Sequence, residues 1–170
     1  MMIEALKTVY AFNREATERV LKTAEQATKE EWLAPQTAGR GSIRDTLVHL
    51  VGGMKVWMAT WGAQLPQGEA ERGTPNPEDF PTVADVQAYF KLMDGALQKY
   101  LDGLKQEDLN QVFTRTMPTG AVWKLPLWQA MLHVTYHGMQ HRSEVAAMLT
   151  AFNHSPGELG FSQFLMGSMG

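Results

Sequence analysis

Apolar residues recur every three to four positions over four long stretches of the chain, which is the spacing of a helix with one buried face. The stretches cover about residues 2–24, 42–61, 82–104 and 126–151. Ser42 and Thr82 each stand three residues before an aspartate, an arrangement typical of the first turn of a helix. Pro126 suits the first turn of the last stretch, because it has no N–H to leave unpaired. The pattern therefore predicts four long helices.

The segments between these stretches have the composition of loops and turns. Residues 25–41 contain one proline and two glycines, and residues 64–81 contain four prolines and two glycines. The second of these loops, at about 18 residues, is longer than most connections in compact domains. Apolar and β-branched residues flank Pro118-Thr119-Gly120 within residues 112–125, and this pattern predicts a small β-hairpin.

Four amphipathic helices in one short chain indicate an all-α fold, a four-helix bundle. A length of 170 residues, of which 44% are apolar, suits a single domain over residues 1–170 with one core. The hairpin would precede the fourth helix. NHSPG at 153–157 ends that helix, and the later stretch LGFSQFLMG predicts a short C-terminal helix. The two long connections indicate that at least one is a crossover.

Charge and composition narrow the possible partners. The net charge is −3 and the isoelectric point is about 5.9, which argues against nucleic acid or an anionic membrane as the main partner. The chain has no cysteine, so it has no disulfide, thiolate ligand or cysteine nucleophile. The N-terminus does not resemble a signal peptide, and there is no run of about 18 apolar residues. We therefore expect a soluble cytoplasmic protein.

Three of the five histidines form a column in the predicted fourth helix, within HVTYHGMQHRSEV. His133, His137 and His141 follow one another at intervals of four residues, so that each lies one turn from the next. The two outer histidines are about 12 Å apart along the helix axis, too far to bind one ion at a Zn–N distance of about 2.1 Å. At most one adjacent pair can therefore share a metal, and both pairs remain open.

A third histidine in another helix would complete a metal site. His137 and His141 lie on or beside the apolar stripe of their helix, where an imidazole without a partner costs about 1–3 kcal/mol. His49, in the second helix, precedes Gly52 and Gly53, whose small size leaves room for an ion or a ligand. The alternatives are hydrogen-bonded core histidines and, for the glycines, close helix packing.

Other familiar metal motifs are missing. The chain lacks the Glu-x-x-His pairs of di-iron bundles, and Gly138 stands where H-E-x-x-H would have its glutamate. Three histidines without a further protein ligand would leave coordination positions open, which is the pattern of catalytic zinc sites. We expect His154, in the turn NHSPG, to be a solvated loop residue.

Two blocks of sequence are similar to a known family. SIRDTLVHLVGGMKVWM at 42–58 and LPLWQAMLHVTYHGMQHRSEVAAML at 125–149 resemble the DinB/YfiT-like proteins. In that family an L-x-H-L/I histidine joins two histidines of an H-x-x-x-H-x-x-x-H-R-G-Q type run, and the likeness in order and spacing covers most of the chain. The resemblance implies a four-helix bundle that holds a divalent metal, often zinc or nickel. The ligands it implies are His49, His137 and His141.

The resemblance also implies roles around this site. His133 would be a neighbour in the second shell or the pocket, and Arg142 would form a structural ion pair or cap. Ser143-Glu144 replaces the usual Gly-Gln, and Tyr136 stands where asparagine is common, so we expect these departures to alter the pocket rim. Tyr136 is itself a candidate pocket residue. Asn13, a polar residue on the stripe of the first helix, is another.

Three kinds of function follow from these observations. The first is a metal-dependent enzyme acting on a small molecule. The resemblance implies a thiol S-transferase with a low-molecular-weight thiol such as bacillithiol or mycothiol as co-substrate, and the residues equally allow a hydrolase. The second is a non-catalytic bundle that binds a metal or small molecule, with a stabilising or stress-related role. The third is an interaction module in which exposed tryptophans such as Trp61 or Trp123 form a dimer face. Members of the family are often homodimers, so the resemblance implies a homodimer here.

Overall fold

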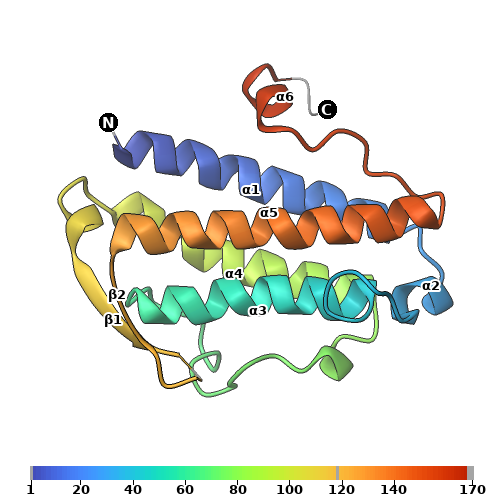
Figure 1. The fold of residues 1–170 in the computed structure, drawn as a ribbon, viewed down its shortest axis with the longest axis horizontal. Coiled ribbons are helices and arrows are strands. Elements are labelled where there is room, and N and C mark those ends of the chain that lie inside the picture. Colours follow the sequence, from blue (N-terminus) through green and yellow to red (C-terminus); the bar gives the residue numbers. More distant parts are fainter. Residues whose placement is uncertain (1, 118, 168–170) are drawn as a thin grey trace.

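The computed structural model describes residues 2–117 and 119–167 and confirms the helical bundle (Figure 1). The four long helices are α1 (Met2–Ala24), α3 (Ile43–Thr60), α4 (Val83–Gly103) and α5 (Leu127–Ala151). The short elements are α2 (Lys29–Leu33), η1 (Pro77–Asp79), η2 (Asp108–Asn110), β1 (Val112–Thr116), β2 (Val122–Pro126) and α6 (Phe161–Leu165). The long helices and the hairpin match the elements that the periodicity predicts.

The bundle contains a crossover, as the long connections predict. In Figure 1, α1 and α5 run in one direction, and α3 and α4 run in the opposite direction. Each of α1 and α3 packs against both α4 and α5, so the four helices enclose a common core. Because α3 and α4 are parallel, the segment 61–82 must return along the length of the bundle before α4 begins.

The two predicted helix caps are present, and they differ in completeness. The Thr82 hydroxyl accepts a hydrogen bond from the Asp85 N–H, and the Thr82 N–H donates to the Asp85 carboxylate at 2.9 Å, which completes a capping box. The Ser42 hydroxyl accepts from the Asp45 N–H at 3.1 Å. The Asp45 carboxylate pairs instead with Arg44, at 2.9 Å, so the second half of this box is replaced by an ion pair.

The predicted hairpin is formed by β1 and β2, which pair in antiparallel register with Arg115 opposite Trp123. Gly120 has a φ of +83°, a value that favours glycine, and it lies in the turn as the sequence indicates. Pro118, part of the predicted turn, lies outside the described residues. Pro126 ends β2 and occupies the cap position of α5, with an extended ψ of 148°, one residue before the predicted helical turn. The strand therefore runs directly into the helix.

The segment 25–41 is more ordered than the loop that its composition predicts. It contains α2, which begins with a capping box between Thr28 and Glu31 and buries Trp32. The expectation that His154 is solvated is wrong, because its Nε2 lies 3.2 Å from the Glu31 carboxylate and its side chain is mostly buried. This contact ties the turn after α5 to α2. The sequence pattern did not predict α2 because a helix of one and a half turns is too short to show a helical period.

The two tryptophans of the third alternative, Trp61 and Trp123, each contact an aromatic ring of the chain itself. Trp61 follows α3 and stacks on Tyr100, with ring centroids 6.1 Å apart. Trp123 is 36% exposed, but its ring lies 6.3 Å from that of Trp57 on α3. Trp61 therefore belongs to the edge of the core, and Trp123 covers the end of α3. Within the described part of the chain, no helix is both long and apolar enough to cross a bilayer.

Candidate metal centre

Three histidines from two helices meet between α3 and α5. One ring nitrogen from each of His49, His137 and His141 lies within 4.8 Å of the other two. His137 Nε2 is 3.1 Å from His49 Nε2. The two helices pack along their length, so a single residue on α3 faces two successive turns of α5. The three histidines implied by the resemblance are thus the three that the fold brings together.

His133 lies outside this cluster. Its ring centroid is 6.3 Å from that of His137, and its closer neighbour is the Trp57 ring at 4.9 Å. The spacing along the helix allowed either His133 with His137 or His137 with His141 to share an ion. The packing of α3 favours His137 with His141, because His49 faces His141 with ring centroids 4.7 Å apart.

The two glycines of α3 make room for different neighbours. A Cβ on Gly53 would lie 2.7 Å from Cε1 of His137, so the missing side chain provides the space that this imidazole occupies. A Cβ on Gly52 would instead lie 2.8 Å from Pro75 of the crossover segment. One glycine therefore admits a candidate ligand, and the other allows the segment 61–82 to approach α3 closely.

Glu144 is a site residue that the sequence reasoning missed. Its carboxylate lies 2.6 Å from Nδ1 of His141, a side chain that is almost completely buried. A carboxylate on one ring nitrogen fixes the orientation of the imidazole and directs the other nitrogen toward a metal. The signal in the sequence was the interval of three residues, which places both side chains on one face of a helix. The resemblance assigns Glu144 only to the pocket rim, as a departure from the family pattern.

The surroundings of His49 and His137 keep these two imidazoles neutral at ordinary pH. Burial, followed by the charge of His141, lowers the pKa of His49 and of His137 to about 4. Partial burial raises the pKa of Glu144, but hydrogen bonds from Gln140 and His141 outweigh this effect and leave the pKa lowered. A metal requires the lone pair of a neutral imidazole. His49 and His137 offer such lone pairs beside a carboxylate that stays ionised.

The donor set suits a divalent cation. Two nitrogens bound to tetrahedral zinc at about 2.1 Å lie about 3.4 Å apart, close to the distance between the facing nitrogens of His49 and His137. Both nitrogens point to the same space, and one cation satisfies both lone pairs. Three imidazoles with no carboxylate or thiolate are a known catalytic zinc set, in which at least one position stays open. The cluster can therefore hold a metal ion.

The other predicted site residues lie at different depths. Tyr136 is 63% exposed and faces solvent from α5. Asn13 donates a hydrogen bond to the Val9 carbonyl on its own helix, and its side-chain oxygen faces Gly138 of α5. It therefore lies in the interface between α1 and α5.

Arg142 points into the bundle, beside the cluster. Its side chain is almost fully buried, and its guanidinium donates to the Thr17 hydroxyl at 3.3 Å. Burial lowers the pKa of Arg142 to about 10. It forms no ion pair within the described residues. The contact that links α5 to α1 is thus a hydrogen bond, where the resemblance implied an ion pair or a cap.

A cavity of about 200 Å³ opens beside His49. It is lined by Val48, His49, Gly52, Gly53, Val56, Trp57, Thr74, Pro75 and Arg115. Three parts of the chain therefore build it, namely one face of α3, the crossover segment and the hairpin. Of the three clustered histidines, His49 borders this space.

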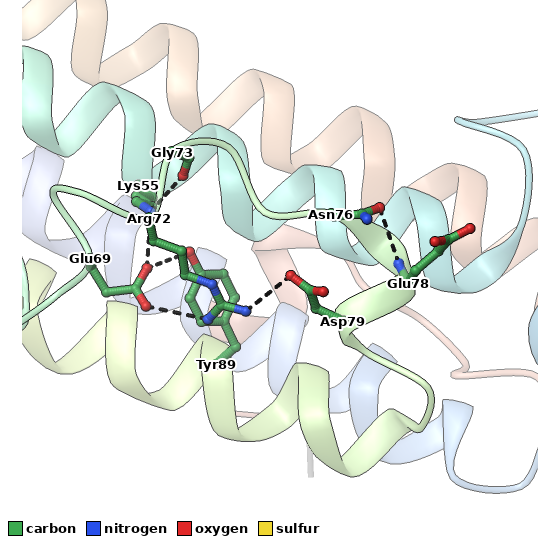
Figure 2. Close-up of polar contacts among 8 residues, drawn as sticks. All are labelled: Lys55, Glu69, Arg72, Gly73, Asn76, Glu78, Asp79 and Tyr89. Carbon is green, nitrogen blue, oxygen red and sulfur yellow. Dashed lines mark hydrogen bonds and ion pairs between the residues drawn. The ribbon is translucent and has the colours of Figure 1, made fainter.

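The crossover wall of the cavity is anchored by a buried ion pair, shown in Figure 2. The Lys55 ammonium lies 3.0 Å from the Glu69 carboxylate and donates to the Gly73 carbonyl at 2.7 Å. The Tyr89 hydroxyl also donates to Glu69, and Arg72 approaches the other carboxylate oxygen. These contacts fix the segment just before Pro75, so this wall has a defined position.

Comparison with known proteins agrees with the fold and the cluster. A family model described as the DinB superfamily matches residues 13–145, which is most of the chain. The chain belongs to the DinB superfamily. The matched span includes all three clustered histidines, and metal binding at this DinB-type cluster is consistent with the geometry.

A solved structure has a similar fold. It is described as a conserved protein from Enterococcus faecalis, and the match has a TM-score of 0.58 at 15% sequence identity. The match covers 84% of this chain and 94% of the other. At this identity the likeness concerns the fold alone. No curated protein matches the chain in the comparison made.

Proposed function

We propose that this DinB protein is a metal-dependent enzyme whose centre is held by His49, His137 and His141. The observation that carries the proposal is the convergence of three imidazole nitrogens within 4.8 Å, beside an accessible cavity. We expect the metal to be zinc or nickel. The reaction we propose is transfer of a low-molecular-weight thiol or, as the second form of the same chemistry, hydrolysis.

A divalent cation bound there would act as a Lewis acid and lower the pKa of a thiol or of water. The chain itself supplies the arrangement around it. Glu144 holds the ring of His141 by its Nδ1, and Gly53 leaves the space in which the His137 ring lies. With no cysteine in the chain, a thiol nucleophile must come from a bound small molecule.

The second candidate is a bundle in which the bound metal or small molecule only stabilises the fold. The burial of His141 and its tie to Glu144 suit a structural metal as well as a catalytic one. The cavity beside His49 favours the enzyme, because a purely structural centre needs no access for small molecules. A screen of thiol-conjugation and ester substrates with the metal-loaded protein separates the two candidates.

Metal analysis of untagged protein tests whether the three histidines bind a metal, on which the proposal depends. We expect about one zinc or nickel ion per chain, lost on His137→Ala or His141→Ala because each removes a ligand. His133→Ala is the matched control, since it removes an imidazole from the same helix, one turn away from the cluster. Wild-type protein that takes up no divalent metal, even when refolded with an excess, would overturn the proposal.

A further inference from the structure

A cation, the guanidinium of Arg115, lines the cavity beside the histidine cluster. Arg115, on β1, lines the same cavity as His49. Within the described residues it takes part in no ion pair. Burial lowers its pKa, with no carboxylate to offset the effect. An arginine that borders a cavity and forms no ion pair has its charge available for an anionic ligand.

The hairpin and α3 hold this guanidinium in one place. Arg115 is paired with Trp123 in the β ladder, so both side chains project from the same face of the hairpin. The Cζ of Arg115 lies 4.3 Å from the centre of the Trp57 ring, and Nη1 donates to the Thr60 hydroxyl at 3.4 Å. A guanidinium carries five N–H donors. This one long hydrogen bond therefore leaves donors for a further acceptor.

The cavity carries a positive charge although the chain as a whole is acidic. The net charge is −3, yet the guanidinium of Arg115 lines the cavity and forms no ion pair within the described residues. A positive charge at the wall of a cavity attracts a small anion.

Aromatic rings pack around Arg115 between α3 and the hairpin. Trp57 contacts the rings of Phe113, Trp123 and His133 at centroid distances of 6.3, 6.3 and 4.9 Å. Trp57 also lines the cavity together with Val56 and Pro75, so an apolar wall lies next to the cation. Such a wall suits an aromatic or apolar body attached to an anionic group.

We propose that Arg115 binds the carboxylate of the substrate, and that the substrate is a small carboxylic acid with an aromatic or apolar body resting on the apolar wall of the cavity, which includes Val56, Trp57 and Pro75. The planar fork of a guanidinium matches the two oxygens of a carboxylate. The substrate class rests on the proposed function, because the histidine cluster would hold the reacting end. Arg115 itself would act as a binding residue that sets specificity.

Binding of benzoate, compared with that of its neutral analogue benzamide, tests the proposal. Isothermal titration of both zinc-loaded and metal-free protein separates attraction to Arg115 from attraction to the metal. A hydrogen bond between charged groups is worth enough for about a tenfold or greater preference. We expect benzoate to be preferred by at least that factor in both forms. Equal binding of the two probes by metal-free wild-type protein would overturn the proposal.

Three variants assign the preference to one side chain. Arg115→Met keeps an unbranched apolar stem against Trp57 but removes the charge, and it should abolish the preference. Arg115→Lys keeps the charge and should retain part of it. Lys124→Met is the matched control, since Lys124 pairs with Thr114 on the opposite face of the same hairpin. A benzoate preference that survives in Arg115→Met would overturn the proposal.

Measurements of folding and of metal content separate the proposed anion site from the proposed metal-dependent function. Circular dichroism and thermal unfolding identify any variant whose hairpin is lost, and Arg115→Lys then carries the comparison. Zinc content should be unchanged in all three variants, because none of these residues belongs to the cluster. A protein that binds no metal yet prefers benzoate through Arg115 would contradict the proposed function and leave the anion site standing.

Discussion

Replacing Gly53 by alanine should disable the metal centre while leaving the fold intact. The added Cβ would lie 2.7 Å from Cε1 of His137 and 3.4 Å from each ring nitrogen. Carbon atoms in good contact lie about 3.5 Å apart or more, so the ring must move by about 0.8 Å. Metal–ligand distances tolerate only about 0.2 Å of deviation. The imidazole of His137 would therefore leave the position that the cluster requires.

The substitution should weaken metal binding and leave the stability of the metal-free protein nearly unchanged. Alanine in place of glycine within a helix gains about 0.5–1 kcal/mol, and rotating the His137 ring away costs about as much. The two nearly cancel. Loss of a group that merely orients a ligand weakens metal binding about 10–100-fold, so displacement of a ligand should cost at least 100-fold, or about 2.8 kcal/mol.

Competition for zinc with a chromophoric chelator measures the affinity, and thermal unfolding with and without zinc measures the stability. Gly95→Ala is the control, because Gly95 is exposed on α4 and an added Cβ would meet nothing within 4 Å. It should stabilise the protein slightly and leave zinc affinity unchanged. Wild-type zinc affinity in Gly53→Ala would refute the reasoning, as would a loss of several kcal/mol in its metal-free stability.

Three further predictions concern the surroundings of the cluster. Glu144→Ala should weaken zinc binding about 10–100-fold, whereas Glu144→Gln, which keeps an oxygen acceptor, should lose less; equal losses in chelator competition would contradict this. Lys55→Met leaves Glu69 buried without its lysine and should cost about 3 kcal/mol in urea unfolding; a loss below about 1 kcal/mol would count against a structural role for the pair. The pKa values of His49 and His137, about 4 in the folded chain against about 6.5 unfolded, mean that the unfolded chain binds more protons in this interval. Metal-free stability should therefore fall as pH drops from 6.5 to 4, and less steeply in His137→Asn; a slope that this variant leaves unchanged would exclude the histidine as its source.

The crossover segment 61–82 connects the stability of the protein with the shape of the cavity beside His49. The ion pair of Lys55 and Glu69 holds the segment before Pro75, and Pro75 borders the cavity beside His49. The pair therefore contributes to the shape of the entrance as well as to stability. Neither residue drew attention in the sequence, because a buried ion pair across 14 positions leaves no local pattern.

The sequence by itself determined the elements whose cause is local. The four long helices follow from a period of three to four residues, and their starts at Ser42 and Thr82 follow from capping groups three residues apart. Helix geometry alone also excluded a single site made of His133, His137 and His141, because the rise per residue separates the outer two.

Only the tertiary structure decided how these elements meet. Which histidine pair faces His49 depends on the register between α3 and α5, and that register depends on a close approach such as Gly53 against His137. The place of Arg115 on the cavity wall likewise depends on the hairpin folding back onto Trp57. Such contacts join residues tens of positions apart. Periodicity and spacing report only neighbours within a few turns, such as Glu144 beside His141. The packing of the bundle alone could bring His49 to the histidines of α5 and Arg115 to the same cavity.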